Sequence, residues 1–116
     1  MKFWKELEQA GQLDQLVEDS KGTPVIIFKH STRCSISQTA LKRLERSWEV
    51  KPEEGVKMVY LDLLRHRDIS NLIAEKFGVV HESPQLLLVQ NGQCTFSRTH
   101  LSIRLEEVFD FLSAKN

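Results

Sequence analysis

Residues 24–37 have the sequence Pro24-Val-Ile-Ile-Phe28, then Lys-His-Ser-Thr-Arg, then Cys34-Ser-Ile-Ser37. The run 24–28 is β-branched and aromatic without polar alternation, which is typical of a central strand buried on both faces. After Cys34, apolar side chains recur at every fourth position, which predicts a helix with one buried stripe. That stripe consists of Ile36, Ala40, Leu44 and Trp48. Cys34 is therefore expected at the N-terminus of a helix that directly follows a buried strand.

The segments on either side of this region also alternate between helix and strand patterns. Upstream, residues 3–7 are ambiguous between a short strand and a helix start. An amphipathic helix that ends near Ser20 is predicted by the apolar residues Leu13, Leu16 and Val17. Downstream, the polar residues 49–55 indicate a loop, and residues 56–63 are predicted to form a second buried strand.

The second half of the chain predicts a helix, a β-hairpin and a final helix. Asp68 is expected to cap the first of these helices and Gly78 to end it. Two strands, 86–89 and 94–98, flank Asn91-Gly92, which is a type I′ hairpin signal. Ser102 is expected to cap the last helix. The expected inner faces of the two helices are Ile69, Leu72, Ile73 and Phe77, and then Leu105, Val108, Phe109 and Leu112.

This order of elements predicts an α/β fold with a thioredoxin-like arrangement. Right-handed crossovers make strands 24–29 and 56–62 parallel, and the antiparallel hairpin extends the sheet. The expected architecture is a central mixed sheet of four to five strands, flanked by helices on both faces. Residues 1–116 are expected to form a single thioredoxin-like domain, because the chain is too short for two ordinary domains.

Composition excludes several classes of protein. Sixteen basic residues are balanced by sixteen acidic ones, so neither nucleic acid nor an anionic membrane surface is an expected partner. No apolar run approaches the roughly 20 residues of a membrane span, and the first residues lack the apolar core of a signal peptide. A cytoplasmic location is expected.

The two cysteines, Cys34 and Cys94, are too few for a disulfide framework. A zinc site would need histidine ligands, and no histidine has finger-like spacing to a cysteine pair, so no metal is expected. The four histidines are His30, His66, His81 and His100. If the chain carries out cysteine chemistry, one thiol is expected to perform it.

Cys34 has the position of a nucleophile, because the N-terminus of a helix stabilises a thiolate. The alternative is a buried, inert cysteine. In Cys34-Ser-Ile-Ser37, a hydroxyl stands where a redox C-x-x-C motif has its second thiol, so no disulfide can close within the motif. Ser37 is expected to donate a hydrogen bond to the thiolate, or else to satisfy backbone groups of the first helical turn.

Two further residues have open roles at this stage. His30 could pair with the thiolate or assist proton transfer, and it could equally be a structural histidine. Cys94 is expected to be a packing residue, because a resolving role would require its sulfur to lie within disulfide reach of Cys34.

The segments Phe28-Lys-His-Ser-Thr-Arg-Cys-Ser-Ile-Ser37 and His81-Glu-Ser-Pro-Gln85 resemble the monothiol bacilliredoxins of the YtxJ type, over nearly the whole chain. These thioredoxin-like proteins have an active-site Thr-Cys-Pro-Ile-Ser. This chain differs from them at Arg33, where the family usually has Thr, and at Ser35, where it has Pro. Both departures bear on reactivity and on the preferred small thiol more than on the identity of the nucleophile.

The resemblance implies that Cys34 removes the small thiol bacillithiol from mixed disulfides on oxidised cytosolic proteins. It implies bacillithiol as a co-substrate, no bound cofactor, and an external thiol or reductase for recycling. It also implies a cis Pro84, with the Ser83 backbone pairing with an extended substrate. Thr32 and Arg33 are expected to contact the same substrate.

Two other interpretations remain open. A monothiol glutaredoxin would use glutathione in the same chemistry, although those proteins usually carry Cys-Gly-Phe-Ser, unlike residues 34–37 here. A thioredoxin-like binding module would hold a partner segment beside Pro84 without turnover, and its Cys34 would react like an ordinary thiol.

Overall fold

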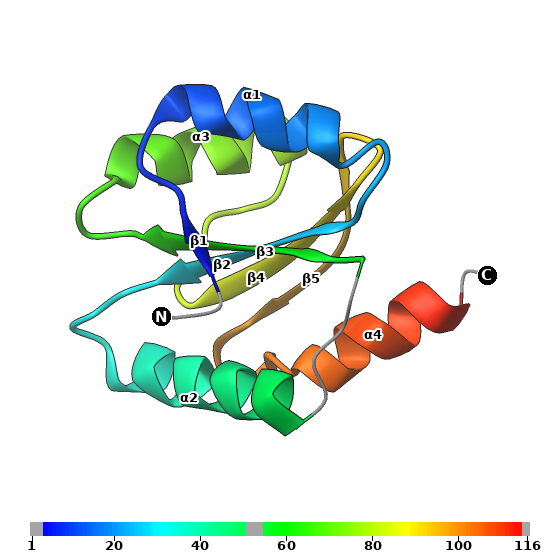
Figure 1. The fold of residues 1–116 in the computed structure, drawn as a ribbon. Coiled ribbons are helices and arrows are strands. Elements are labelled where there is room, and N and C mark those ends of the chain that lie inside the picture. The colour runs from blue at the N-terminus through cyan, green and yellow to red at the C-terminus, as the bar shows by residue number, and fades with distance from the viewer. Residues whose placement is uncertain (1–3, 51–54, 115–116) are drawn as a thin grey trace.

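The computed structural model describes residues 4–50 and 55–114. Five strands form one mixed sheet in the order β1-β3-β2-β4-β5. The strands are β1 (Lys5–Glu6), β2 (Val25–His30), β3 (Lys57–Asp62), β4 (Gln85–Gln90) and β5 (Gln93–Thr99). The helices are α1 (Ala10–Asp19), α2 (Ser35–Val50), α3 (Arg67–Phe77) and α4 (Leu105–Ala114), with a short 3-10 turn, η1 (His100–Ser102), before α4. Helices α1 and α3 cover one face of the sheet and α2 and α4 the other (Figure 1).

The predicted α/β fold is confirmed, with β2 at the centre of the sheet. β2 runs parallel to β3, from Val25 opposite Lys57 to His30 opposite Asp62, and antiparallel to β4. All six residues of β2 are buried because helices cover both faces. The ambiguous N-terminal segment contains the two-residue strand β1, which pairs in parallel with β3.

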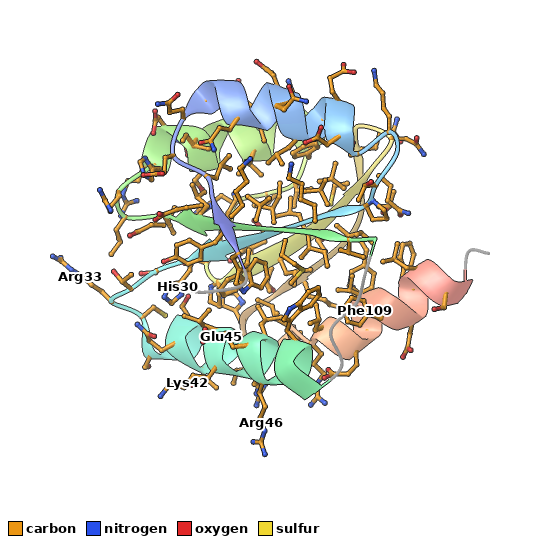
Figure 2. The ribbon with its side chains drawn as sticks, in the orientation of Figure 1. His30, Arg33, Lys42, Glu45, Arg46 and Phe109 are labelled. Atoms are coloured by element: carbon orange, nitrogen blue, oxygen red, sulfur yellow. The ribbon has the colours of Figure 1, made fainter. Side chains whose placement is uncertain are left out.

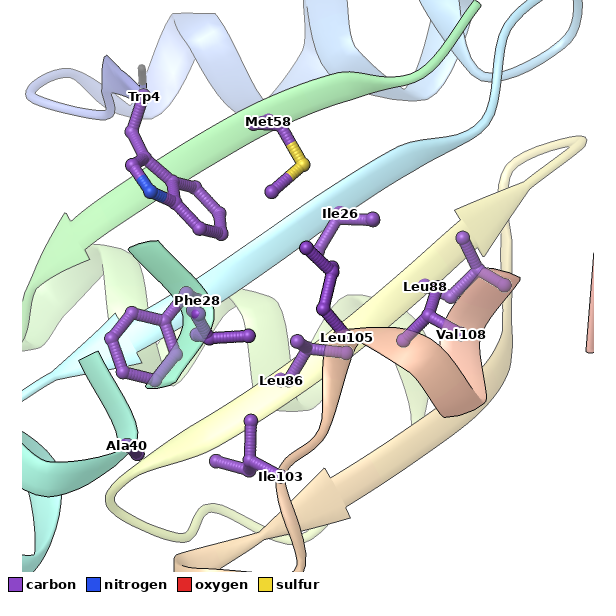
Figure 3. Packing of buried hydrophobic residues seen from close by; sticks show 11 residues of the cluster. Trp4, Ile26, Phe28, Ala40, Met58, Leu86, Leu88, Ile103, Leu105 and Val108 are labelled. Atoms are coloured by element: carbon purple, nitrogen blue, oxygen red, sulfur yellow. The ribbon is translucent and has the colours of Figure 1, made fainter. Parts of the chain in front are cut away.

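Side chains of β2 alternate between two hydrophobic clusters, as the pleat of a strand requires. Ile26 and Phe28 pack toward α2 and α4, whereas Val25 and Ile27 pack toward α1 and α3. Figure 3 shows the first cluster, in which Phe28 lies close to the indole of Trp4. The same alternation places Lys29 on the α1 and α3 side and His30 on the α2 side.

Turn residues have the predicted positions at two places. Gly78 follows α3 in the left-handed conformation, with φ 63°, and ends that helix. Asn91 and Gly92 both have positive φ, 52° and 74°, as a type I′ hairpin requires.

The predicted helix caps were wrong at two positions. Asp68 lies inside the first turn of α3, and His66 is the N-cap, because the His66 carbonyl accepts from the N–H of Ser70. Ser102 does not cap α4, because it belongs to η1 and the helix begins only at Leu105.

The predicted buried stripes were wrong at two positions as well. Ile36 is 40% exposed and Leu72 is 39% exposed, whereas the other members of their stripes are buried or partly buried. In α2 the buried residue of the first turn is Ser37. Of the predicted loop 49–55, positions 49 and 50 belong to α2, and residues 51–54 lie outside the described residues. No helix within 4–50 or 55–114 has the length and apolar character needed to cross a membrane.

Candidate functional site

Cys34 lies in the tight turn between the end of β2 and the start of α2. Its N–H donates to the carbonyl of Ser31 (3.2 Å), and its own carbonyl accepts from the N–H of Gln38 (3.0 Å), as the residue before a helix does. The side chain is partly exposed. Cys34 therefore stands at the positive end of the 16-residue helix α2, where a thiolate is stabilised and an incoming disulfide can reach it.

Ser37 is fully buried beneath this turn and has two polar partners. Its Oγ accepts a hydrogen bond from the backbone N–H of Ser31 (3.0 Å) and lies 2.6 Å from Nδ1 of His30. Within the described part of the chain, no hydrogen bond joins Ser37 to Cys34. The structure thus shows Ser37 in the alternative role, as the partner of a backbone group of the turn, and does not show the predicted donation to the thiolate.

His30 is buried between the sheet and α2 (Figure 2). Its ring stacks on Phe28 and meets Tyr60 at an angle, both with ring centroids 5.7 Å away. Burial lowers the pKa of His30 below its ordinary value, and the nearby Asp62 carboxylate partly opposes this shift. The imidazole is therefore neutral at neutral pH, so it has one protonated and one unprotonated nitrogen.

The position of that single proton decides what Ser37 can do. If Nδ1 is unprotonated, it accepts the Ser37 hydroxyl proton, which is then unavailable to Cys34. If Nδ1 carries the proton, it donates to Oγ, and the hydroxyl proton is no longer bound to His30. The contact between His30 and Ser37 is kept in both arrangements, and only the direction of the hydrogen bond changes.

The Ser83–Pro84 peptide bond is cis, the geometry that the family resemblance implies. Gln85, the first residue of β4, pairs with Lys29 near the end of β2. Ser83 and Pro84 therefore lie at the same edge of the sheet as the turn that carries Cys34. Oγ of Ser83 is buried and has no hydrogen-bond partner among residues 4–50 and 55–114.

A family model described as monothiol bacilliredoxin BrxC matches residues 5–108. The chain belongs to the monothiol bacilliredoxin family.

Solved structures similar to this bacilliredoxin share its thioredoxin fold. One, described as a candidate oxidoreductase with a thioredoxin fold, is 29% identical, with a TM-score of 0.81 over 94% of this chain and 93% of that chain. The thioredoxin of Fasciola hepatica is 14% identical, with a TM-score of 0.70 over 97% and 99% of the two chains. A reduced thioredoxin pre-protein of Schistosoma mansoni is 22% identical, with a TM-score of 0.67 over 94% of each.

At their low identity the two thioredoxins show the fold alone. Family and fold together make this chain a thiol–disulfide oxidoreductase.

Thr32 and Arg33, the other predicted substrate contacts, are exposed beside Cys34. The Thr32 carbonyl accepts from the side-chain amide of Gln38 (3.1 Å), which fixes the backbone of the turn. The Arg33 side chain extends away from the body of the bacilliredoxin (Figure 2). The Arg33 guanidinium can therefore contact only a ligand that is bound on the solvent side of the turn.

Cys94 does not belong to this site. It lies on β5 opposite Val89, which pairs with Val25 at the start of β2, whereas Cys34 follows the end of β2. The length of β2, roughly 16 Å, separates the two positions and exceeds disulfide reach. Burial raises the pKa of the Cys94 thiol, and its Sγ contacts the Phe96 carbonyl at 3.4 Å, as expected for a packing cysteine.

Sequence reasoning missed one polar cluster, which lies on the opposite face of the sheet. Lys29 is fully buried there and contacts Ser70 of α3 and His81 of the loop before Pro84. The available signal was a lysine that continues a buried apolar strand. No group of three His, Cys, Asp or Glu residues in the described ranges is placed to hold a metal ion.

Proposed function

We propose that this bacilliredoxin removes bacillithiol from mixed disulfides on oxidised cytosolic proteins. The single observation that supports this most is the combination of Cys34, partly exposed at the start of α2, with a buried hydroxyl at Ser37 in place of a second thiol. Such a site can accept a small thiol in a mixed disulfide but cannot close a disulfide of its own.

The proposed step is one thiol–disulfide exchange. The Cys34 thiolate attacks the bacillithiol sulfur of the client's mixed disulfide, and a new sulfur–sulfur bond forms as the client sulfur leaves as a thiolate. The client thiolate then takes a proton from water. One disulfide is consumed and one is formed, so no external oxidant or reductant is needed for this step.

The residues around Cys34 support the step in different ways. In the proposed step Ser37 turns its hydroxyl toward the Cys34 sulfur when Nδ1 of His30 is protonated, and it donates a hydrogen bond to Nδ1 in the other arrangement. The backbone at Ser83 pairs with an extended client segment, as an added strand would. Thr32 and Arg33 contact the bound disulfide from the exposed side of the turn.

Recycling requires a thiol from outside the motif. A second thiolate, supplied by a free small thiol or a reductase, attacks the mixed disulfide on Cys34 and restores the starting state. The roughly 16 Å length of β2 keeps Cys94 from taking this role. The client proteins and this external thiol are the partners that we propose, in the reducing environment of the cytosol.

The test is intact mass after the reduced protein is mixed with a client protein that carries bacillithiol. We expect a gain of one bacillithiol on the wild-type chain and none on Cys34→Ala, with Cys94→Ala as the matched control that keeps the gain. A parallel client carrying glutathione tests the small thiol, and faster transfer from it would replace bacillithiol by glutathione in the proposal. No transfer from either client, with Cys34 alkylated at the rate of an ordinary thiol, would instead indicate a binding module.

A further inference from the structure

Lys29 is a buried cation without an acidic partner in the part of the chain that the structure describes. Its side chain has no exposed surface, and it lies on the α1 and α3 side of β2, away from Cys34. The ammonium donates to the backbone carbonyl of Ser70 (3.1 Å) and lies 3.4 Å from Nδ1 of His81. Burying an unpaired charge lowers the stability of the fold. We therefore expect a function of Lys29 other than stabilising the fold.

The chemistry of this contact assigns the proton on His81. An ammonium group can only donate, so Nδ1 of His81 must accept and Nε2 must carry the ring proton. Oγ of Ser70 lies 3.2 Å from the same nitrogen and shares its single lone pair with the ammonium. Burial and the neighbouring Lys29 charge lower the pKa of His81, which keeps its ring neutral. Lys29 and α3 together therefore hold His81 in one orientation.

A hydrogen bond from β4 also holds the loop before Pro84. The side-chain amide of the buried Gln85 donates to the carbonyl of Val80 (3.0 Å). The Val80 side chain is 81% exposed and His81 is exposed too, so hydrophobic burial contributes little to holding them. Val79 packs against the second hydrophobic cluster, and Glu82 lies 3.6 Å from His100. Between them, residues 80 and 81 are held by polar contacts to Lys29, Ser70 and Gln85.

We propose that Lys29, acting through Ser70 and His81, is a positioning residue that sets the backbone of the Ser83–Pro84 loop for pairing with a client protein. This inference rests on the proposed exchange function. Loss of the lysine would let the loop move and weaken the binding of extended clients. The chemistry at Cys34 would be spared, because His30 and Ser37 lie on the other face of the sheet.

The proposal also predicts a dependence on pH. The residues facing Lys29 from α3, β4 and β3 are Ser70, Gln85 and Leu61, all uncharged, and from the loop it is faced by the neutral His81. The charged groups that act on His81 besides Lys29 are Glu82 and Arg67. Burial lowers the pKa of Lys29 to about 8, so client binding is expected to weaken above that pH, when the amine loses its charge.

The test compares Lys29→Met with Lys21→Met, which removes an exposed lysine paired with Glu18. Each variant reacts with a bacillithiolated client protein and with a small aromatic disulfide that makes no contact with the loop. For Lys29→Met at neutral pH we expect KM for the client to rise about tenfold, with kcat and the rate with the small disulfide unchanged. The further rise in KM that we expect for the wild type above pH 8 should be absent in this variant. Lys21→Met should match the wild type in every measurement.

An unchanged KM, or an equal loss with both substrates, would overturn the positioning role. Amide hydrogen exchange of residues 79–83 gives a readout that does not depend on catalysis. We expect at least tenfold faster exchange there in Lys29→Met, and equal exchange would also overturn the proposal. If the wild type transfers no bacillithiol while this exchange difference is present, the proposed function fails and the control of the loop by Lys29 stands.

Discussion

The Ser37 hydroxyl contacts the imidazole of His30, and the proposed exchange would require it to donate to the sulfur of Cys34 instead. His30 is already in hydrogen-bond contact at 2.6 Å, and the neutral ring can either accept or donate there. Because Ser31 supplies a further donor to the same oxygen, Ser37 stays fixed whichever way its proton points. The serine thus takes part in the structure of the turn as well as in the chemistry of the thiol.

Replacement Ser37→Ala should therefore affect stability and reactivity together. It leaves two buried groups, the Ser31 N–H and Nδ1 of His30, without their partner, and should lower the free energy of unfolding by about 1–3 kcal/mol. It also removes the donor that the proposed function assigns to the thiolate, so alkylation of Cys34 at neutral pH should slow about tenfold. Urea denaturation and iodoacetamide kinetics measure the two effects. Ser35→Ala, at an exposed position of the same turn, is the control, and a similar loss there would contradict this account.

Sequence alone could place Cys34 and Ser37 at a helix start, because apolar spacing and the cysteine position are local features. It could not show that Ser37 points inward while Ile36 points outward. A stripe chosen by hydrophobicity selects the isoleucine, whereas the folded chain turns the serine toward His30, seven residues earlier. The contact between Ser37 and His30 depends on the direction in which the chain leaves β2 and enters α2. The apolar periodicity of the sequence does not contain this information.

At the scale of elements, the helices were predictable from their apolar period and the buried strands from continuous apolar runs, and Gly78 and Asn91-Gly92 mark two of the turns. The strand β1 was not, because residues 3–7 fit a strand or a helix start equally. The caps were less predictable. Asp68 has the side chain of a cap, yet His66 takes that position because its N–H bonds to the carbonyl of Asp62 and begins the turn earlier. A cap is set by where the preceding strand ends, and that follows from the register of the sheet.

The register of the sheet also decides the role of Cys94. β4 carries Gln85 at the end beside Pro84 and Val89 at the other end, where Cys94 pairs with it. Cys94→Ala should therefore leave bacillithiol transfer and recycling unchanged, while the loss of a partly buried side chain costs about 1 kcal/mol. Transfer kinetics and thermal unfolding check the two parts. A mixed disulfide on Cys34 that persists longer in Cys94→Ala than in the wild type would show that Cys94 resolves it after all.

For the molecule as a whole, two helical layers give the sheet two independently lined faces. The α2 face holds His30 and Ser37 beneath Cys34, and the α1 and α3 face holds Lys29 beneath the loop that leads to Pro84. Alternation along β2 alone separates the two neighbours Lys29 and His30. The sequence signal for the burial of Lys29, its place directly after a buried apolar run, is weak because a lysine at a strand end is usually solvated.

The burial of Lys29 should affect how the free energy of unfolding of the whole chain depends on pH. Its pKa is about 8 in the folded chain and near 10.5 when unfolded, so the unfolded chain binds more protons between these values. The cost of the buried charge is therefore complete below pH 8 and is relieved as the pH rises through 8 toward 10. In urea denaturation at pH 7, the free energy of unfolding of Lys29→Met should exceed that of the wild type by at most about 3 kcal/mol. This difference should shrink by pH 10.

The difference between variant and wild type is the quantity to measure, because other groups titrate in the same range. Burial raises the pKa of Tyr60, so the unfolded chain loses that proton first and stability falls as the pH rises past 10 in both proteins. Subtracting the two curves removes this contribution. An advantage of Lys29→Met that stays constant from pH 7 to 10 would mean that Lys29 is neutral throughout, and a variant less stable at pH 7 would mean that its hydrogen bonds outweigh the cost of burying its charge.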